Sequence, residues 1–156
     1  MHAAPEPIRA VVDLNLFVSG LISRLGQPFQ LVEYLRQDAF LVVISQQLRD
    51  ELEEVLRREK FVTRFGLTAE SRDAFLALLD AKAQAVTPSL VLPVRVRDQN
   101  DEIVLATALG GDADYLVTGD EDLLVLRGER SIAPLQIVTV REFLQALARV
   151  TPKTSS

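Results

Sequence analysis

The stretch "DEIVLATALGGDADYLVTGD", Asp101–Asp120, decides the fold. Its first half has the apolar spacing of a helix over Asp101–Leu109, which Gly110-Gly111 is suited to end. A short apolar run, Tyr115–Thr118, is typical of a buried strand, and the carboxylate of Asp120 follows it after one glycine. A helix that leads directly into a buried strand is the repeating unit of α/β proteins.

The same alternation continues on both sides of this stretch. Further buried strands are predicted at Ile8–Asp13, Phe40–Ile44 and Gln136–Val138. Helices are predicted from about Leu16, and over Phe29–Arg36, Gln46–Arg58, Ala69–Lys82, Asp120–Leu126 and Val140–Ala148, with Ser45, Thr68 and Asn100 as N-caps. Strands that alternate with helices predict an α/β fold whose central sheet is mainly parallel and covered on both faces.

The remaining segments and the bulk composition fit one globular domain. Arg57–Arg64 is interpreted as a basic connector, and Ala85–Val96 as extended chain with one short strand. The 156 residues, 48% of them apolar, are expected to form a single domain over residues 8–149, between tails at 1–7 and 150–156. No apolar run approaches the roughly 20 residues that span a bilayer, so no membrane partner is expected. The N-terminus lacks a signal-peptide core and the chain lacks cysteine, which favours the cytoplasm.

Residue usage limits the chemistry. The chain has no cysteine and one histidine, His2, close to the N-terminus. Catalysis by a Ser–His or Cys–His pair, and zinc bound by thiolates or imidazoles, are therefore excluded. Any catalytic site must use carboxylates, hydroxyls, lysine or arginine. The net charge of −5 does not favour a nucleic-acid partner, but local sorting of charge leaves one open.

Four carboxylates have reasons to meet. Asp13 and Asp120 each follow a predicted strand, and the C-terminal ends of parallel strands share one edge of the sheet, where ligands bind. Asp101 lies on the apolar face of its predicted helix. Among the three glutamates of "ELEEVLRR", Glu51 lies nearest the apolar stripe of its helix. The spacing thus predicts an acidic cluster at the sheet edge.

Each acid alone has an ordinary explanation. Asp13 could end a strand in a turn. Asp101 could be an acid of the first helical turn, where the helix dipole favours a negative charge. Glu51 could be solvated with partners four residues away, and Asp120 or Asp122 could cap a helix. Carboxylates crowded together repel one another and are normally retained with a bound cation. Because only oxygen ligands are on offer, Mg²⁺ or Mn²⁺ is the expected cofactor.

These motifs resemble the PIN-domain nucleases, particularly the small bacterial toxin components of toxin–antitoxin pairs (VapC-like). The matching pieces run in order from Val11 to Leu144: "VVDLNLFVSGLIS", "SQQLRDELEEVLRREKF", "RDQNDEIVLATALGGDADYLVTGDEDLL" and "IVTVREFL". The resemblance implies a Rossmann-like α/β/α sandwich. It also implies a catalytic metal site built from Asp13, Glu51, Asp101 and Asp120, with Asn15, Thr118 and Asp122 as secondary members.

Two further positions near this site, Asp98 and Leu14, are not counted among its members. Asp98 lies close to Asp101 but is interpreted as a loop residue. Leu14 departs from the family pattern, because many members carry Thr or Ser between the Asp and the Asn that correspond to Asp13 and Asn15. The departure removes one hydroxyl from the site.

The resemblance implies a reaction and partners. The chain is expected to be a Mg²⁺- or Mn²⁺-dependent endoribonuclease that hydrolyses single-stranded RNA with one or two ions. A small antitoxin and a second copy of the chain are its expected partners. Because an acidic site must still attract a polyanion, basic residues near the acids are the candidates for RNA contacts: Arg57, Arg58, Lys60, Arg64 and Arg97.

Phosphotransfer receivers and HAD-like phosphatases also have an acidic pocket after a first strand. Phosphotransfer receivers need an acceptor Asp at the end of a middle strand and a late lysine, but the second predicted strand ends in Ile44-Ser45 and no lysine lies between Lys82 and Lys153. Phosphatases of the HAD type need a second Asp where this chain has Asn15. The stronger alternative is a PIN-like module that binds RNA or protein without cleaving it.

Overall fold

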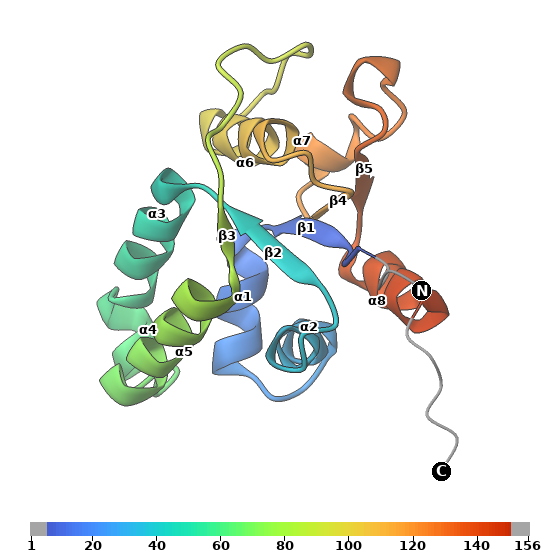
Figure 1. Cartoon of the computed structure of the whole chain (residues 1–156). Helices are drawn as coiled ribbons and strands as arrows, with labels where there is room; N and C mark the ends of the chain where they lie inside the picture. The colour runs from blue at the N-terminus through green and yellow to red at the C-terminus, as the bar shows by residue number, and fades with distance from the viewer. Residues whose placement is uncertain (1–5, 151–156) are drawn as a thin grey trace.

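Five parallel strands form the central sheet, in the order β3-β2-β1-β4-β5. The computed structural model of the protein describes residues 6–150 (Figure 1). The strands are β1 (Arg9–Val12), β2 (Leu41–Ile44), β3 (Gln84–Ala85), β4 (Tyr115–Val117) and β5 (Gln136–Val138). The expected α/β class with a parallel sheet is confirmed.

Helices cover both faces of this sheet, which makes three layers. They are α1 (Leu14–Ile22), α2 (Gln27–Arg36), α3 (Gln46–Leu56), α4 (Glu59–Thr63), α5 (Ala69–Lys82), α6 (Gln99–Gly110), α7 (Glu121–Leu124) and α8 (Val140–Val150), with a 3-10 turn at Arg130–Ile132. Figure 1 shows α6 and α7 above the sheet, α1, α2 and α8 below it, and α3, α4 and α5 together beside β3. Among the described residues, no helix is long and apolar enough to cross a membrane.

The strand order reverses at β1. The chain moves outward from β1 to β2 and β3, and then returns to place β4 on the other side of β1. The C-terminal ends of β1 and β4 are adjacent, since the amide of Asp13 donates a hydrogen bond of 2.9 Å to the carbonyl of Val117. In open parallel sheets the crevice beyond such a reversal is where ligands bind. Residues directly after β1 and β4 are therefore placed to form a site.

The core holds these strand ends in position. Every residue of β1, β2 and β4 is buried except the first, which is half-buried. On the face below the sheet, the ring of Phe143 meets those of Phe40 and Tyr115 edge-on, at centroid distances of 5.0 and 5.5 Å. Such close packing makes the sheet a rigid support for the loops that follow the strands.

Several local predictions can be checked against these elements. Ser45 and Thr68 cap α3 and α5 as expected. The prediction for Asn100 was wrong, because Asp98 is the cap of α6 and its carboxylate accepts the Asn100 amide at 2.8 Å. The prediction that Arg57–Arg64 is only a basic connector was also wrong in part, since the helix α4 lies within it. Residues 1–5 and 151–156, most of the two expected tails, lie outside the described residues.

Gly110, at the end of α6, gives a prediction for stability. A Cβ on Gly110 would lie 2.1 Å from the Thr87 carbonyl oxygen and 2.6 Å from the Ser89 amide nitrogen. Both are backbone atoms, and the Ser89 amide is held by the Ala106 carbonyl at 2.9 Å. We expect Gly110→Ala to lower the free energy of unfolding by about 1–3 kcal/mol, measured by urea denaturation. Gly128→Ala, where a Cβ meets nothing within 4 Å, is the matched control, and equal stability of the two variants would contradict this packing.

Candidate metal centre

Asp13 is fixed at the end of β1 by two hydrogen bonds. Its Oδ1 accepts the Asn15 amide at 3.1 Å, which begins α1, and its Oδ2 accepts the Thr118 hydroxyl at 2.7 Å. Only 8% of Asp13 is exposed, and Thr118 is fully buried. The strand therefore ends on a carboxylate whose orientation is set by the neighbouring strand end.

Asp120 is held in the same network. Its amide donates to the Thr118 hydroxyl at 3.0 Å, and its Oδ1 accepts the Asp122 amide at 2.8 Å as the N-cap of α7. Thr118 thus links Asp13 to the Asp120 backbone. The hydroxyl expected beside the site therefore bonds the carboxylate of one acid and the backbone of the other.

Asp101 is the buried acid of the group. It lies in the first turn of α6 with 6% of its surface exposed, and its Oδ2 is buried without a hydrogen-bond partner among the described residues. The pKa of Asp101 is raised from 3.8 to about 7, first by burial and then by the nearby carboxylates of Asp120, Asp98 and Asp13. The protein therefore holds a carboxyl group that lacks a partner for its charge.

A tight cluster of oxygens surrounds Asp101. Carboxylate oxygens of Asp98, Asp101 and Asp122 lie within 4.8 Å of one another. Asp122 was expected only as a secondary member, and Asp98 was missed as a candidate ligand. The signal for Asp98 was its spacing: an N-cap three residues before Asp101 places both carboxylates at the same helix start.

The four expected acids share one cavity of about 280 Å³. Its lining includes Asp13, Glu51, Asp101 and Asp120, together with Leu14, Asn15, Val55, Asp98, Asn100 and Val104. Glu51 reaches it from α3 and is half-buried. Leu14 is 7% exposed, so a buried methyl-bearing side chain stands where the family resemblance leads us to expect a hydroxyl. The structure brings these acids together; the role of each remains a prediction.

The expected RNA contacts divide into two groups. Arg58 and Lys60 line the cavity, beside Phe61. Arg57 is turned away to Glu53, with the ion-pair atoms 3.7 Å apart. Arg64 and Arg97 are exposed and do not line the cavity. Positive charge therefore borders the acidic site on the α3–α4 side.

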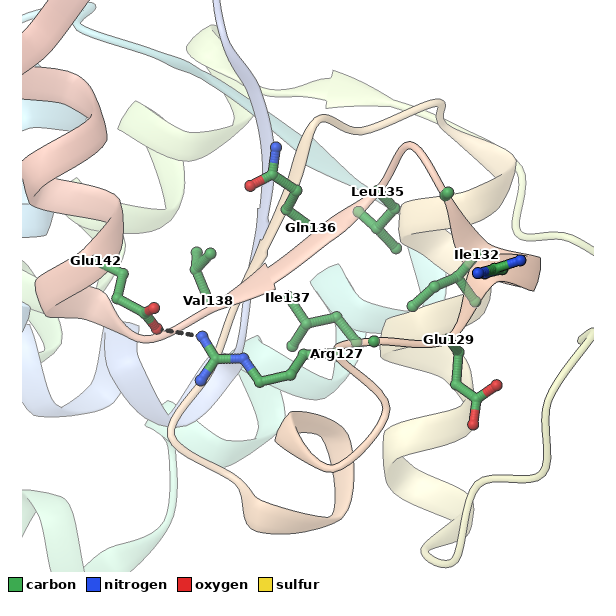
Figure 2. Close-up of a pocket in the computed structure, with 11 residues that line it drawn as sticks. Arg127, Glu129, Ile132, Leu135, Gln136, Ile137, Val138 and Glu142 are labelled. Carbon is green, nitrogen blue, oxygen red and sulfur yellow. Dashed lines mark hydrogen bonds and ion pairs between the residues drawn. The ribbon is translucent and has the colours of Figure 1, made fainter.

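A larger cavity, of about 420 Å³, lies along the outer edge of β5 (Figure 2). Arg127 crosses it to bond Glu142 at 2.5 Å, and Glu142 also accepts the Thr139 amide at 2.9 Å. The remaining lining is mostly aliphatic, from residues such as Ile132, Leu135 and Val138. None of the expected site residues lines it, and two of its charged residues, Arg127 and Glu142, are paired with each other. Size alone therefore does not mark the functional site.

The donor set fits a divalent cation. All candidate ligands are carboxylate oxygens, which suit Mg²⁺ and Mn²⁺. A cation would supply the missing partner of Asp101 Oδ2 and offset the mutual repulsion that raises the pKa of Asp101. The arrangement can therefore hold a metal ion beside a cavity open to an anionic substrate.

Comparisons with known proteins point the same way. A family model described as PIN domain matches residues 9–122, which include the four expected acids together with Asp98 and Asp122. Uncharacterized protein MJ1680 of Methanocaldococcus jannaschii is 25% identical over 146 residues, covering 88% of this chain and 90% of the relative. The fold resembles a chain in the crystal structure of VapBC2 from Rickettsia felis bound to a DNA fragment from their promoter. The TM-score is 0.54 at 14% identity, over 85% of this chain and 98% of that one.

Proposed function

Since this chain belongs to the PIN domain family, a family of nucleases, we propose that it hydrolyses phosphodiester bonds of single-stranded RNA with Mg²⁺ or Mn²⁺. The observation that carries the proposal is the state of Asp101, which is buried among other acids and whose Oδ2 has no hydrogen-bond partner among the described residues. A carboxylate kept in that position lowers stability unless a cation binds there. Its cost to the fold is explained by a function in metal binding.

The roles of the acids follow from their surroundings. Asp13, Asp101 and Asp120 would hold the main ion, with Asp98 and Asp122 beside Asp101 and with Glu51 in the lining of the same cavity. When bound, the cation lowers the pKa of a coordinated water and polarises the phosphate. Thr118 keeps Asp13 in one orientation, and the capping amides of Asn15 and Asp122 do the same for Asp13 and Asp120. No protein nucleophile is needed.

Arg58 and Lys60 are proposed to contact the phosphates of the RNA. Replacing either with Gln is expected to raise KM for a single-stranded RNA several-fold and to leave kcat nearly unchanged. The slope of log KM against log NaCl concentration should fall by about one, because one fewer counterion is released from the RNA on binding. The measurement is steady-state cleavage at several NaCl concentrations. Arg57→Gln is the matched control, because Arg57 is paired with Glu53 and does not line the cavity. An equal rise of KM in the control would contradict the assignment.

The direct test of function is cleavage of a labelled single-stranded RNA by the purified protein, with and without Mn²⁺. Asp13→Asn and Asp101→Asn are run beside the wild type. We expect cleavage by the wild type that depends on Mn²⁺, and none by either variant. Unchanged cleavage by the variants would overturn the site assignment. Absence of both metal binding and cleavage would favour the alternative, a PIN-like module that binds RNA or protein.

The proposal extends to a biological setting. From the family resemblance we propose a toxin that is paired with a small antitoxin and that acts as a homodimer; a chain of a VapBC2 structure shares the fold. Co-expression of the chain with the gene adjacent to its own, followed by size-exclusion chromatography, tests both partners. A monomer that co-elutes with no neighbour-encoded protein would remove this extension and leave the nuclease proposal intact.

A further inference from the structure

An aromatic pair leads from the acidic cavity to the surface. Phe61 lines the cavity and is 8% exposed, whereas Phe65 is 46% exposed. Their ring centroids lie 6.0 Å apart, with the planes inclined at 30°. Phe65 therefore lies beside a ring that lines the cavity and leaves nearly half of its own surface exposed.

The backbone fixes the position of this open ring. The Leu67 amide donates to the Phe61 carbonyl at 2.9 Å, and the Arg64 amide donates to the Lys60 carbonyl at 3.0 Å. Gly66, between Phe65 and Leu67, adopts the left-handed conformation with φ of 69°, which closes the turn. The buried side chain of Leu67 anchors the turn to the core. Phe65 is thus presented on a defined turn.

Three cationic residues lie close to the pair in the sequence. In the part of the chain that the structure describes, Arg58, Lys60 and Arg64 form no ion pair with an acid. The Nζ of Lys60 lies 5.0 Å from the centroid of the Phe61 ring. Free cations interleaved with an exposed aromatic ring are the features with which proteins hold single-stranded nucleic acids: cations follow the phosphates, and rings stack on bases.

We propose that Phe65 is a base-stacking residue of the RNA site. The base of a nucleotide next to the scissile phosphate stacks on the exposed face of Phe65, while Arg58 and Lys60 contact the phosphate. This inference rests on the proposed nuclease function and gives a structural reason why the substrate would be single-stranded rather than double-stranded RNA. Bases of a duplex are already stacked on their neighbours, so Phe65 favours single strands. A protein partner is the less favoured occupant, because unpaired cations interrupt the apolar surface.

The test is a cycle that removes the ring and the base separately. Affinity is measured by fluorescence anisotropy for an RNA octamer and for an abasic octamer with the same backbone. Ca²⁺ replaces Mg²⁺, and a gel checks that the RNA stays intact. Proteins compared are the wild type, Phe65→Ala, Phe65→Tyr, and Leu25→Ala as an exposed apolar control outside the cavity lining. We expect Phe65→Ala to weaken binding of the normal octamer roughly tenfold or more, with little change for the abasic one. Phe65→Tyr and Leu25→Ala should bind as the wild type does.

A second measurement reads the stacking directly. The chain has no tryptophan, so Phe65→Trp introduces a single indole, whose emission is expected to be quenched by the normal octamer and not by the abasic one. Equal loss of affinity for both octamers would show that Phe65 only supports the fold and would overturn the inference. Unchanged affinity of Phe65→Ala, with Mn²⁺-dependent cleavage retained, would also overturn it while leaving the nuclease function in place. A wild type that neither binds nor cuts RNA would remove both.

Discussion

Asp101→Asn is expected to stabilise the metal-free protein and to abolish its cleavage of RNA. The two effects have one cause, the buried carboxylate, whose pKa is raised to about 7, mainly by burial. Between pH about 4 and 7 the unfolded chain has lost this proton while the folded chain retains it, so the free energy of unfolding falls as pH rises. Below that window the group contributes no pH dependence, and above it the loss is complete. Asparagine carries no charge and removes this contribution.

The size of the effect can be bounded. Each pH unit that separates the folded and unfolded pKa values is worth about 1.4 kcal/mol, which sets an upper limit near 4 kcal/mol for Asp101. We expect a gain of about 2 kcal/mol at pH 8, because the amide remains buried without a full set of partners. Urea denaturation in EDTA from pH 4 to 8 measures it. Curves that stay parallel for the two proteins across this range would contradict the assignment. Cleavage in Mn²⁺ should fall at least about a thousandfold.

Asp13→Ala is expected to abolish cleavage as well, but with the opposite effect on stability. Asp13 accepts two hydrogen bonds, from the Asn15 amide and the Thr118 hydroxyl, and the second of these is buried. Losing them costs about 1–3 kcal/mol. Removing the charge of Asp13 also relieves Asp101, but Asp13 is the last of the causes that raise the pKa of Asp101, so the lost hydrogen bonds outweigh this relief.

The same denaturation experiment in EDTA at pH 8 compares the two variants. The account predicts a free energy of unfolding above the wild type for Asp101→Asn and below it for Asp13→Ala. Thr118→Val is the matched control for the network, since it removes the hydroxyl that bonds Asp13 and keeps the carboxylate. It should be destabilised like Asp13→Ala while retaining part of the cleavage. Stabilisation by Asp13→Ala would show that repulsion, rather than hydrogen bonding, dominates at the strand end.

The spacing of apolar residues in two helices predicted which of their acids face inward. It placed Asp101 on the buried face of α6 and selected Glu51 from three glutamates of α3, and both side chains line the cavity. These predictions succeeded because an inward direction follows from the spacing of apolar residues on the same element. The strand order also mattered: Asp13 and Asp120 meet only because β4 lies beside β1, and a parallel sheet shares its C-terminal edge.

The failures lie where local signals compete. Asp98 and Asn100 are both good N-caps, and spacing alone does not decide which of them begins α6. The choice of Asp98 adds an acid to the cluster. The helix α4, of five residues, is too short for a periodic signal, and its helical state depends on burying Phe61. Arg58 and Lys60, at the start of this helix, line the cavity, while Arg57 pairs with Glu53.

The most direct test of the central claim is calorimetric titration of the metal-free protein with Mn²⁺ at pH 6.5, in two buffers of different ionisation enthalpy. At that pH Asp101 is mostly protonated, since its pKa is about 7. The account predicts saturable binding that releases up to about one proton per protein, and loss of binding in Asp101→Asn. No binding heat in the wild type, or undiminished binding by Asp101→Asn, would contradict a metal centre built around this residue.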